Sequence, residues 1–181
     1  MSVNGQKIAF LVAPEGVEQV ELTEPWAAVE KAGGQPVLVV GGDQKQVQAF
    51  NHLDRGDTFD ADVPVSEARV DDYAGLVLPG GVANPDFLRT VPAAVGFARA
   101  FVEAGQPVAA ICHAPWLLVE ADVVRGRRMT SWPSLQTDLR NAGATWADEE
   151  VVVDRTGPGP LITSRKPDDL AAFSEAITST F

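Results

Sequence analysis

The chain has 181 residues, of which 45% are hydrophobic and 22% charged, the composition of an ordinary globular protein. Its formal net charge of −11 is spread along the chain and repels a phosphate backbone, so we expect no nucleic-acid partner. The N-terminus lacks the basic region and long apolar run of a signal peptide, and no apolar run could span a bilayer, so we expect a cytoplasmic protein without membrane contact.

Short apolar segments and helical patterns alternate along the chain, which predicts an α/β fold with a mostly parallel sheet. The expected strands are 7–13, 36–42, 74–81, 107–111, 150–154 and 160–164. The expected helices are 22–32, 85–106, a segment that begins at Pro115, 133–143 and a C-terminal segment from about Asp168. Residues 43–69 are irregular, with a small hairpin as the expected local structure.

No internal repeat or linker divides the chain, so residues 1–181 are expected to form a single domain, a three-layer α/β/α sandwich. In an open parallel sheet, ligands bind at the carboxyl ends of the strands. Three loops follow such ends: "APEGVEQVE" (13–21), "PGGVANPD" (79–86) and "CHAP" (112–115). If their strands are neighbours, these loops converge on one crevice.

Cys112, the single cysteine, is expected at a tight turn between a strand and the helix that begins at Pro115. A thiol at this place faces unpaired backbone N–H groups and the positive end of the helix dipole, and both lower its pKa. Such N–H groups also stabilise an oxyanion, and Gly80 and Gly81 are expected to add backbone donors. The alternative is that Cys112 is an inert, buried small side chain.

The other residue types exclude several kinds of site. One cysteine cannot form an internal disulfide, nothing resembles a zinc-ligand cluster, and "APEGVEQ" lacks the G-x-G-x-x-G pattern, so we expect no metal and no cofactor. No histidine follows position 113, which excludes the triad of α/β-hydrolases and of glutamine amidotransferases. Any base is therefore His113, His52 or a carboxylate.

The segments "AICHAPWLL", "LVLPGG" and "EGVEQVELTEP" together resemble the ThiJ/PfpI superfamily, and most closely its PfpI-type bacterial stress proteins. The similarity extends over almost the whole chain. It implies a flavodoxin-like sandwich with a nucleophile elbow, a nucleophilic Cys112 and a partner glutamate from the first loop. Distance to the proline in "VELTEP" assigns that glutamate to Glu21, with Glu15 and Glu18 as the other candidates.

A carboxyl group that assists a thiolate must carry a proton, because an ionised Glu21 would repel the sulfur. This pairing is expected to lower the pKa of the Cys112 thiol and to raise that of the Glu21 carboxyl. The alternative for Glu21 is a carboxylate at a helix N-terminus that only interacts with the helix dipole.

The resemblance also implies that His113 pairs with an acid of a neighbouring subunit in a homodimer or larger homo-oligomer. The matching acid here is Asp86, which alternatively caps a helix. Neighbouring residues on an elbow rarely face each other, so His113 is expected to supply a backbone amide and this second contact rather than to be the base for Cys112. Trp132 and Glu18 are expected to line the substrate site, although Trp132 is alternatively a packing residue.

These residues lead to two functional hypotheses. In the first, a PfpI-type stress protein is a thiol-dependent hydrolase, a peptidase or a deglycase or glyoxalase-like enzyme, whose Cys112 attacks peptides or methylglyoxal and its protein adducts. In the second, the protein is a non-catalytic redox sensor whose Cys112 oxidises to sulfenic and then sulfinic acid, since there is no second cysteine to resolve it. A third interpretation is a partner-binding sandwich in which Cys112 is only packed.

Overall fold

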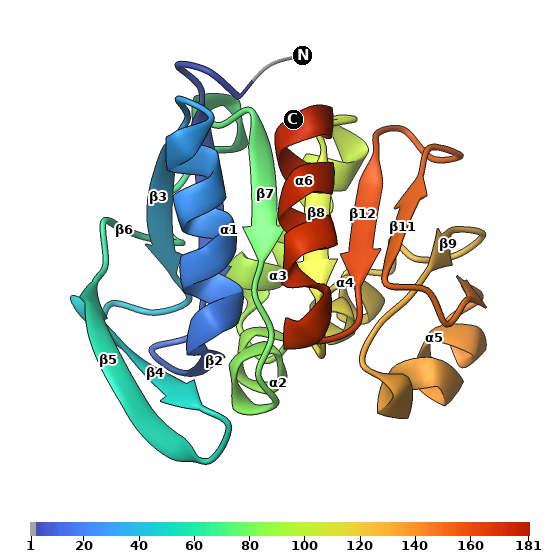
Figure 1. The fold of residues 1–181 in the computed structure, drawn as a ribbon, viewed down its shortest axis with the longest axis horizontal. Coiled ribbons are helices and arrows are strands. Elements are labelled where there is room, and N and C mark those ends of the chain that lie inside the picture. Colours follow the sequence, from blue (N-terminus) through green and yellow to red (C-terminus); the bar gives the residue numbers. More distant parts are fainter. Residues whose placement is uncertain (1–2) are drawn as a thin grey trace.

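The computed structural model describes residues 3–181 and contains a mixed sheet with the strand order β11-β12-β8-β7-β1-β3-β6 (Figure 1). All neighbours in this sheet are parallel except β11 and β12. Its strands are β1 (Lys7–Val12), β3 (Gln35–Val40), β6 (Val63–Pro64), β7 (Gly75–Leu78), β8 (Val108–Ile111), β11 (Val151–Asp154) and β12 (Leu161–Ser164). The expected α/β fold with a mostly parallel sheet is confirmed.

Helices cover both faces of this sheet. They are α1 (Gln19–Lys31), α2 (Ala83–Leu88), α3 (Pro92–Glu103), α4 (Pro115–Glu120), α5 (Gln136–Asn141) and α6 (Leu170–Thr180). Helices α1 and α6 pack side by side on one face, and α2, α3 and α4 lie on the other (Figure 1). Alternate residues of β1 point into the two cores, because successive side chains of a strand face opposite sides of the sheet.

One long helix was expected over 85–106, and this prediction is wrong. The segment forms α2 and α3, which are separated at Val91. Pro92 begins α3, and the residue before a proline is pushed out of the helical region. Val91 accordingly has extended backbone angles, φ −102° and ψ 105°.

The irregular segment 43–69 contains the expected hairpin, formed by antiparallel β4 (Gln46–Asn51) and β5 (Asp54–Asp60). The first loop, by contrast, is not entirely a loop. It contributes β2 (Glu15–Glu18), which pairs with β4 in a separate three-stranded sheet. A further small pair, β9 (Arg128–Met129) and β10 (Thr145–Trp146), was not expected. No helix within residues 3–181 is long and apolar enough to cross a membrane.

Candidate functional site

The three predicted loops do converge. Strands β1, β7 and β8 are adjacent and parallel, and a cavity of about 780 Å³ opens at their carboxyl ends. Each loop contributes to its wall, represented by Glu18, Gly81 and Cys112. The β4–β5 hairpin forms a further side of the cavity. A single pocket therefore collects residues that lie almost 100 positions apart in the sequence.

Cys112 adopts a left-handed backbone conformation with φ +63°, which is rare for residues other than glycine. Two hydrogen bonds hold it there. Its N–H donates to the carbonyl of Ser164 (3.0 Å), and its carbonyl accepts from the N–H of Trp132 (2.8 Å). The turn places the side chain, which is 6% exposed, in the cavity wall. Backbone strain of this kind concentrates at functional sites, which supports a chemical role for Cys112.

Glu21, in the first turn of α1, is fully buried, and its two carboxyl oxygens have different surroundings. Oε2 accepts a hydrogen bond from the N–H of Gly80 (2.9 Å). Oε1 is buried and has no conventional hydrogen bond, and the carboxyl group's side-chain neighbour is Cys112. Burial raises the pKa of Glu21 to about 8, which confirms the expected direction. The group is therefore mainly protonated at neutral pH, and the proton belongs on Oε1, since Oε2 already accepts an N–H.

The pKa of the Cys112 thiol was expected to be lowered, but burial raises it, and a charge on Glu21 would raise it further. The backbone N–H groups of Gly81 and His113 act in the opposite direction. Because Glu21 keeps its proton at neutral pH, it adds no repulsion to the sulfur. A thiol with a raised pKa keeps its proton at neutral pH, so any nucleophilic reaction of this sulfur would need a nearby proton acceptor.

His113 is placed to be that acceptor. Its Nδ1 lies 3.2 Å from the Cys112 sulfur, so the expectation that these two neighbours would not face each other is wrong. The positive φ at Cys112 changes the direction of the chain and brings both side chains to the same side of the turn. Burial lowers the pKa of His113 to about 4, so the ring is neutral at pH 7 and has a nitrogen lone pair available, but it is a weaker base than a free imidazole.

The two glycines of the β7 turn do not share one role. The N–H of Gly80 is occupied by Glu21, so Gly80 is not available as the expected oxyanion donor. The N–H of Gly81 lies between the two side chains, since it acts on both the Cys112 sulfur and the Glu21 carboxyl, and it is the remaining candidate for the oxyanion donor. A Cβ at Gly80 would lie 2.6 Å from the Cβ of Cys112, so only glycine allows this close approach.

Of the remaining predicted site residues, Trp132 and Glu18 line the cavity and Asp86 does not. Trp132 forms a wall of the cavity, with its ring stacked on His113 at a centroid distance of 5.5 Å. Glu18 lines the cavity and accepts hydrogen bonds from the backbone N–H of His52. Asp86 is exposed on α2 and does not belong to the cavity wall of its own chain. Its contact with a neighbouring subunit stays a prediction.

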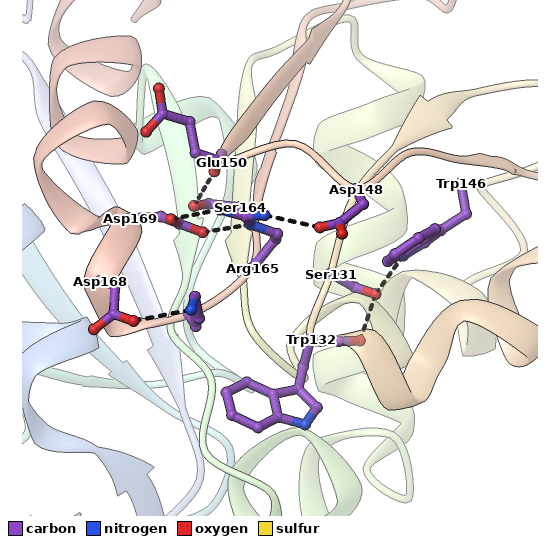
Figure 2. Close-up of polar contacts among 10 residues, drawn as sticks. Ser131, Trp132, Trp146, Asp148, Glu150, Ser164, Arg165, Asp168 and Asp169 are labelled. Carbon is purple, nitrogen blue, oxygen red and sulfur yellow. Dashed lines mark hydrogen bonds and ion pairs between the residues drawn. The ribbon is translucent and has the colours of Figure 1, made fainter.

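A set of polar contacts beside the cavity fixes the segments that carry Trp132 and the residues after β12 (Figure 2). The indole N–H of Trp146 donates to the Ser131 hydroxyl (3.0 Å), which donates to the carbonyl of Trp132 (2.9 Å). Arg165 forms ion pairs with Asp148 and Asp169. Figure 2 shows the Trp132 ring extending away from this network. The network therefore holds the backbone of Trp132 and leaves its ring free of these contacts.

The β4–β5 hairpin was not expected to line the cavity. The cavity is lined by Phe50, Leu53 and Arg55 of the hairpin, and by His52, which the sequence offered as a candidate base. Their sequence pattern predicts only a hairpin. The pairing of β2 with β4, which places this hairpin beside Cys112, leaves no signal in the local sequence. Within residues 3–181 there is no cluster of three or more His, Cys, Asp or Glu side chains that could hold a metal ion.

Comparison with known proteins agrees with this geometry. Residues 6–180 match the model of the DJ-1/PfpI family. The chain belongs to this family. It is 41% identical over 170 residues to protein/nucleic acid deglycase 2 of Escherichia coli, covering 93% of this chain and 94% of that protein. It is 39% identical over 169 residues to YraA of Bacillus subtilis, a proposed cysteine protease, covering 93% and 94% respectively.

Solved structures show the same fold. A two-domain protein of Anabaena variabilis with DJ-1/ThiJ/PfpI-like and ferritin-like domains matches with a TM-score of 0.88 and 36% identity, covering 96% of this chain and 47% of that one. DJ-1beta of Drosophila melanogaster matches with a TM-score of 0.84 and 25% identity, covering 97% and 89%. The ThiJ/PfpI resemblance read from the sequence is thereby confirmed.

Proposed function

We propose that this protein is a cysteine-dependent hydrolase of the stress response that acts on carbonyl substrates, with methylglyoxal and its protein adducts ahead of peptides. The observation that carries the proposal is the grouping of three side chains in one cavity: the Cys112 sulfur, a neutral His113 imidazole 3.2 Å away and the protonated carboxyl of Glu21. The names of the relatives from E. coli and B. subtilis, a deglycase and a proposed cysteine protease, support the same class of chemistry.

The first step of the proposed reaction is addition of sulfur to a carbonyl carbon. As the C–S bond forms, the thiol proton passes to Nδ1 of His113, and the electron pair of the C=O bond moves to its oxygen. The N–H groups of Gly81 and His113 face the sulfur and lie close enough to stabilise that oxygen. Glu21 supplies a proton to it, which gives a hemithioacetal; from an adduct, the protein amine leaves with a proton as sulfur takes its place at that carbon.

The ionised Glu21 then takes the C–H proton of this carbon and a proton returns at the neighbouring carbonyl carbon, so an enediol leads to a thioester without any external oxidant. Water cleaves the thioester to a hydroxy acid and the free thiol; with a peptide, the first adduct instead expels the protonated amine, and water cleaves the resulting thioester.

The rim of the cavity supports a modified protein or peptide as a substrate in addition to free methylglyoxal. Leu53 and Val82, which line the cavity, have exposed fractions of 84% and 57%, and the partly exposed Trp132 ring completes the apolar rim. Exposed apolar side chains grouped beside a reactive centre are typical of surfaces that contact other proteins. A modified peptide would contact this rim while its carbonyl group reaches Cys112.

The test compares wild type with Cys112→Ser on three substrates: methylglyoxal, a methylglyoxal-modified peptide and a chromogenic peptide amide. We expect wild type to consume the first two, and Cys112→Ser to lose at least about 100-fold in turnover, because a serine hydroxyl is a far weaker nucleophile than a thiol. Substrate loss and product mass are measured by mass spectrometry.

Unchanged turnover in Cys112→Ser would refute a thiol-dependent reaction. Cleavage of the peptide amide alone would replace the proposed substrate class with peptides. If wild type turns over none of the three but accumulates sulfinic acid at Cys112 in mild peroxide, the redox-sensor hypothesis replaces the hydrolase.

A further inference from the structure

Asn84 on α2 connects two of the three loops of the cavity through a side chain that is fully buried. Its Oδ1 accepts a hydrogen bond from the N–H of Ala13 (2.6 Å), at the end of β1. Its Nδ2 donates to the carbonyls of two consecutive residues, Pro79 (2.9 Å) and Gly80 (3.0 Å), at the end of β7. One carboxamide therefore uses both of its polar atoms on the backbone of the site.

The geometry of the peptide bond gives these contacts a consequence. In a trans peptide the C=O and the following N–H point in opposite directions, and no peptide bond within residues 3–181 is cis. The carbonyl of Pro79 shares its peptide with the N–H of Gly80, and the carbonyl of Gly80 shares its peptide with the N–H of Gly81. When Asn84 binds both carbonyls, it turns both N–H groups to the opposite side.

That opposite side holds the reactive pair. The N–H of Gly80 donates to Oε2 of Glu21 (2.9 Å), and the N–H of Gly81 faces the sulfur of Cys112. A peptide between two glycines rotates more easily than any other, since neither residue has a Cβ. Within residues 3–181, the Gly80 carbonyl accepts one further hydrogen bond besides that from Asn84, a long one from the N–H of Glu18 (3.4 Å).

We infer that Asn84 is a positioning residue, which aims the N–H groups of Gly80 and Gly81 at Glu21 and Cys112 by binding the carbonyls of the same two peptides. Its importance for turnover rests on the proposed function. Its effect on the two side chains does not, because hydrogen bonds to the thiolate and to the carboxylate exist without any substrate. Asn84 does not touch the reacting atoms and acts only through the backbone.

A purely structural role for Asn84 makes a different prediction. If its loss only loosened the turn, water would enter and shift the pKa values of Glu21 and Cys112 toward their ordinary values. If its loss instead misdirects the two N–H groups, both side chains lose a donor to their charged forms, and both pKa values rise. The sign of the change separates the two possibilities. Glu18, the other carboxylate that acts on Glu21, is unchanged in either case.

The experiment uses Asn84→Leu, which keeps the volume of the side chain and removes its polar atoms. The pKa of Glu21 is measured from its carboxyl ¹³C shift, and thiolate formation at Cys112 from the rate of iodoacetamide alkylation between pH 6 and 10. We expect the Glu21 pKa to rise by about one unit and alkylation to slow by about tenfold, the effect of one hydrogen bond to a charged group. Leu88→Ala, a buried change on the same helix whose side chain lies beside Gly41 in the core and has no polar atoms, is the control and should leave both values in place.

A Glu21 pKa that stays constant or falls in Asn84→Leu overturns the inference. If this variant does not fold, the wild-type protein provides the decision. The amide signals of Gly80 and Gly81 and the side-chain NH₂ signals of Asn84 must then all follow the titration of Glu21, because Asn84 binds the carbonyls of the same two peptides. Asn84 signals that do not move would refute the assignment. None of these measurements uses a substrate. If the protein proves not to be a hydrolase, they still test the role of Asn84, so the two failures can be told apart.

Discussion

In the proposed reaction, the proton on Glu21 has two separable uses beside Cys112. As a hydrogen-bond donor it stabilises the sulfur without adding negative charge, and as an acid it can leave for the substrate oxygen. Burial creates both properties, because it raises the pKa of this carboxyl to about 8 and keeps the proton in place at neutral pH. A substitution that preserves the first use and removes the second can therefore show which one turnover needs.

Glu21→Gln is that substitution. The amide oxygen can accept from Gly80 and the NH₂ group can donate toward Cys112, but no proton can be released. We expect iodoacetamide alkylation of Cys112 at pH 7 to stay within about threefold of wild type, the effect of less than one neutral hydrogen bond. Turnover of methylglyoxal should fall by about 100-fold or more, the usual contribution of a general acid.

Glu24→Gln makes the same change at an exposed position of the same helix and should alter neither rate. Full turnover in Glu21→Gln would show that the proton donor lies elsewhere. Equal losses of alkylation and turnover would show that Glu21 acts on the sulfur alone.

At the scale of elements, the position of the Trp132 segment depends on a contact from β10, which pairs in parallel with β9 outside the main sheet. Trp146 on β10 binds Ser131, and Ser131 binds the Trp132 carbonyl, so a short relay fixes the turn before α5. The ring itself is 36% exposed and is held mainly by its stacking on His113. The relay binds the carbonyl of Trp132, whereas the N–H of Trp132 binds the carbonyl of Cys112 (2.8 Å). Loss of the relay should therefore loosen the wall of the cavity while this second hydrogen bond still holds Cys112.

Trp146→Phe removes the indole N–H and keeps an aromatic ring. We expect KM for a modified peptide to rise about fivefold, equivalent to one neutral hydrogen bond, with kcat changed less than about twofold. Trp26→Phe is a matched control, because Trp26 also donates its indole N–H, to Glu30, on the surface of α1. A fall in kcat at constant KM would instead place Trp132 in the chemical step.

Elements with a strong local pattern could be predicted from sequence, and those that depend on distant pairing could not. The buried strands and the turn at Cys112 follow from apolar runs and from Pro115, and the motif assigned Glu21. Strand β2 was missed because its pairing with β4 is not visible in "EGVE". The position of the His113 ring beside the Cys112 sulfur was missed for another reason. It follows from the positive φ of Cys112, and a pattern of hydrophobic residues does not predict the φ of a single residue.

At the scale of the whole molecule, the same buried groups make stability depend on pH. A carboxyl whose pKa rises from 4.5 to about 8 on folding holds a proton that the unfolded chain has lost, so its stabilisation is complete below pH 4.5 and disappears as pH rises through 8. A histidine whose pKa falls from 6.5 to about 4 acts oppositely and destabilises the fold as pH drops from 6.5 to 4. Between pH 4.5 and 6.5 the two effects of Glu21 and His113 largely cancel.

Above pH 6.5 Glu21 dominates the pH dependence, since ordinary carboxyl groups are already ionised, the effect of His113 fades above its unfolded pKa of 6.5, and Cys112 contributes only above the usual thiol range. We therefore expect the melting temperature to fall by about 5 °C between pH 6.5 and 8, from a slope of about 1.4 kcal/mol per pH unit in a chain of this size. Differential scanning calorimetry at constant ionic strength measures it. Glu21→Gln should flatten the curve, whereas Glu103→Gln, an exposed change on α3, should keep the wild-type slope. A wild-type melting temperature that is level or rising over this range would mean that Glu21 is ionised in the folded protein, and that its carboxylate, rather than a carboxylic acid, stands beside Cys112.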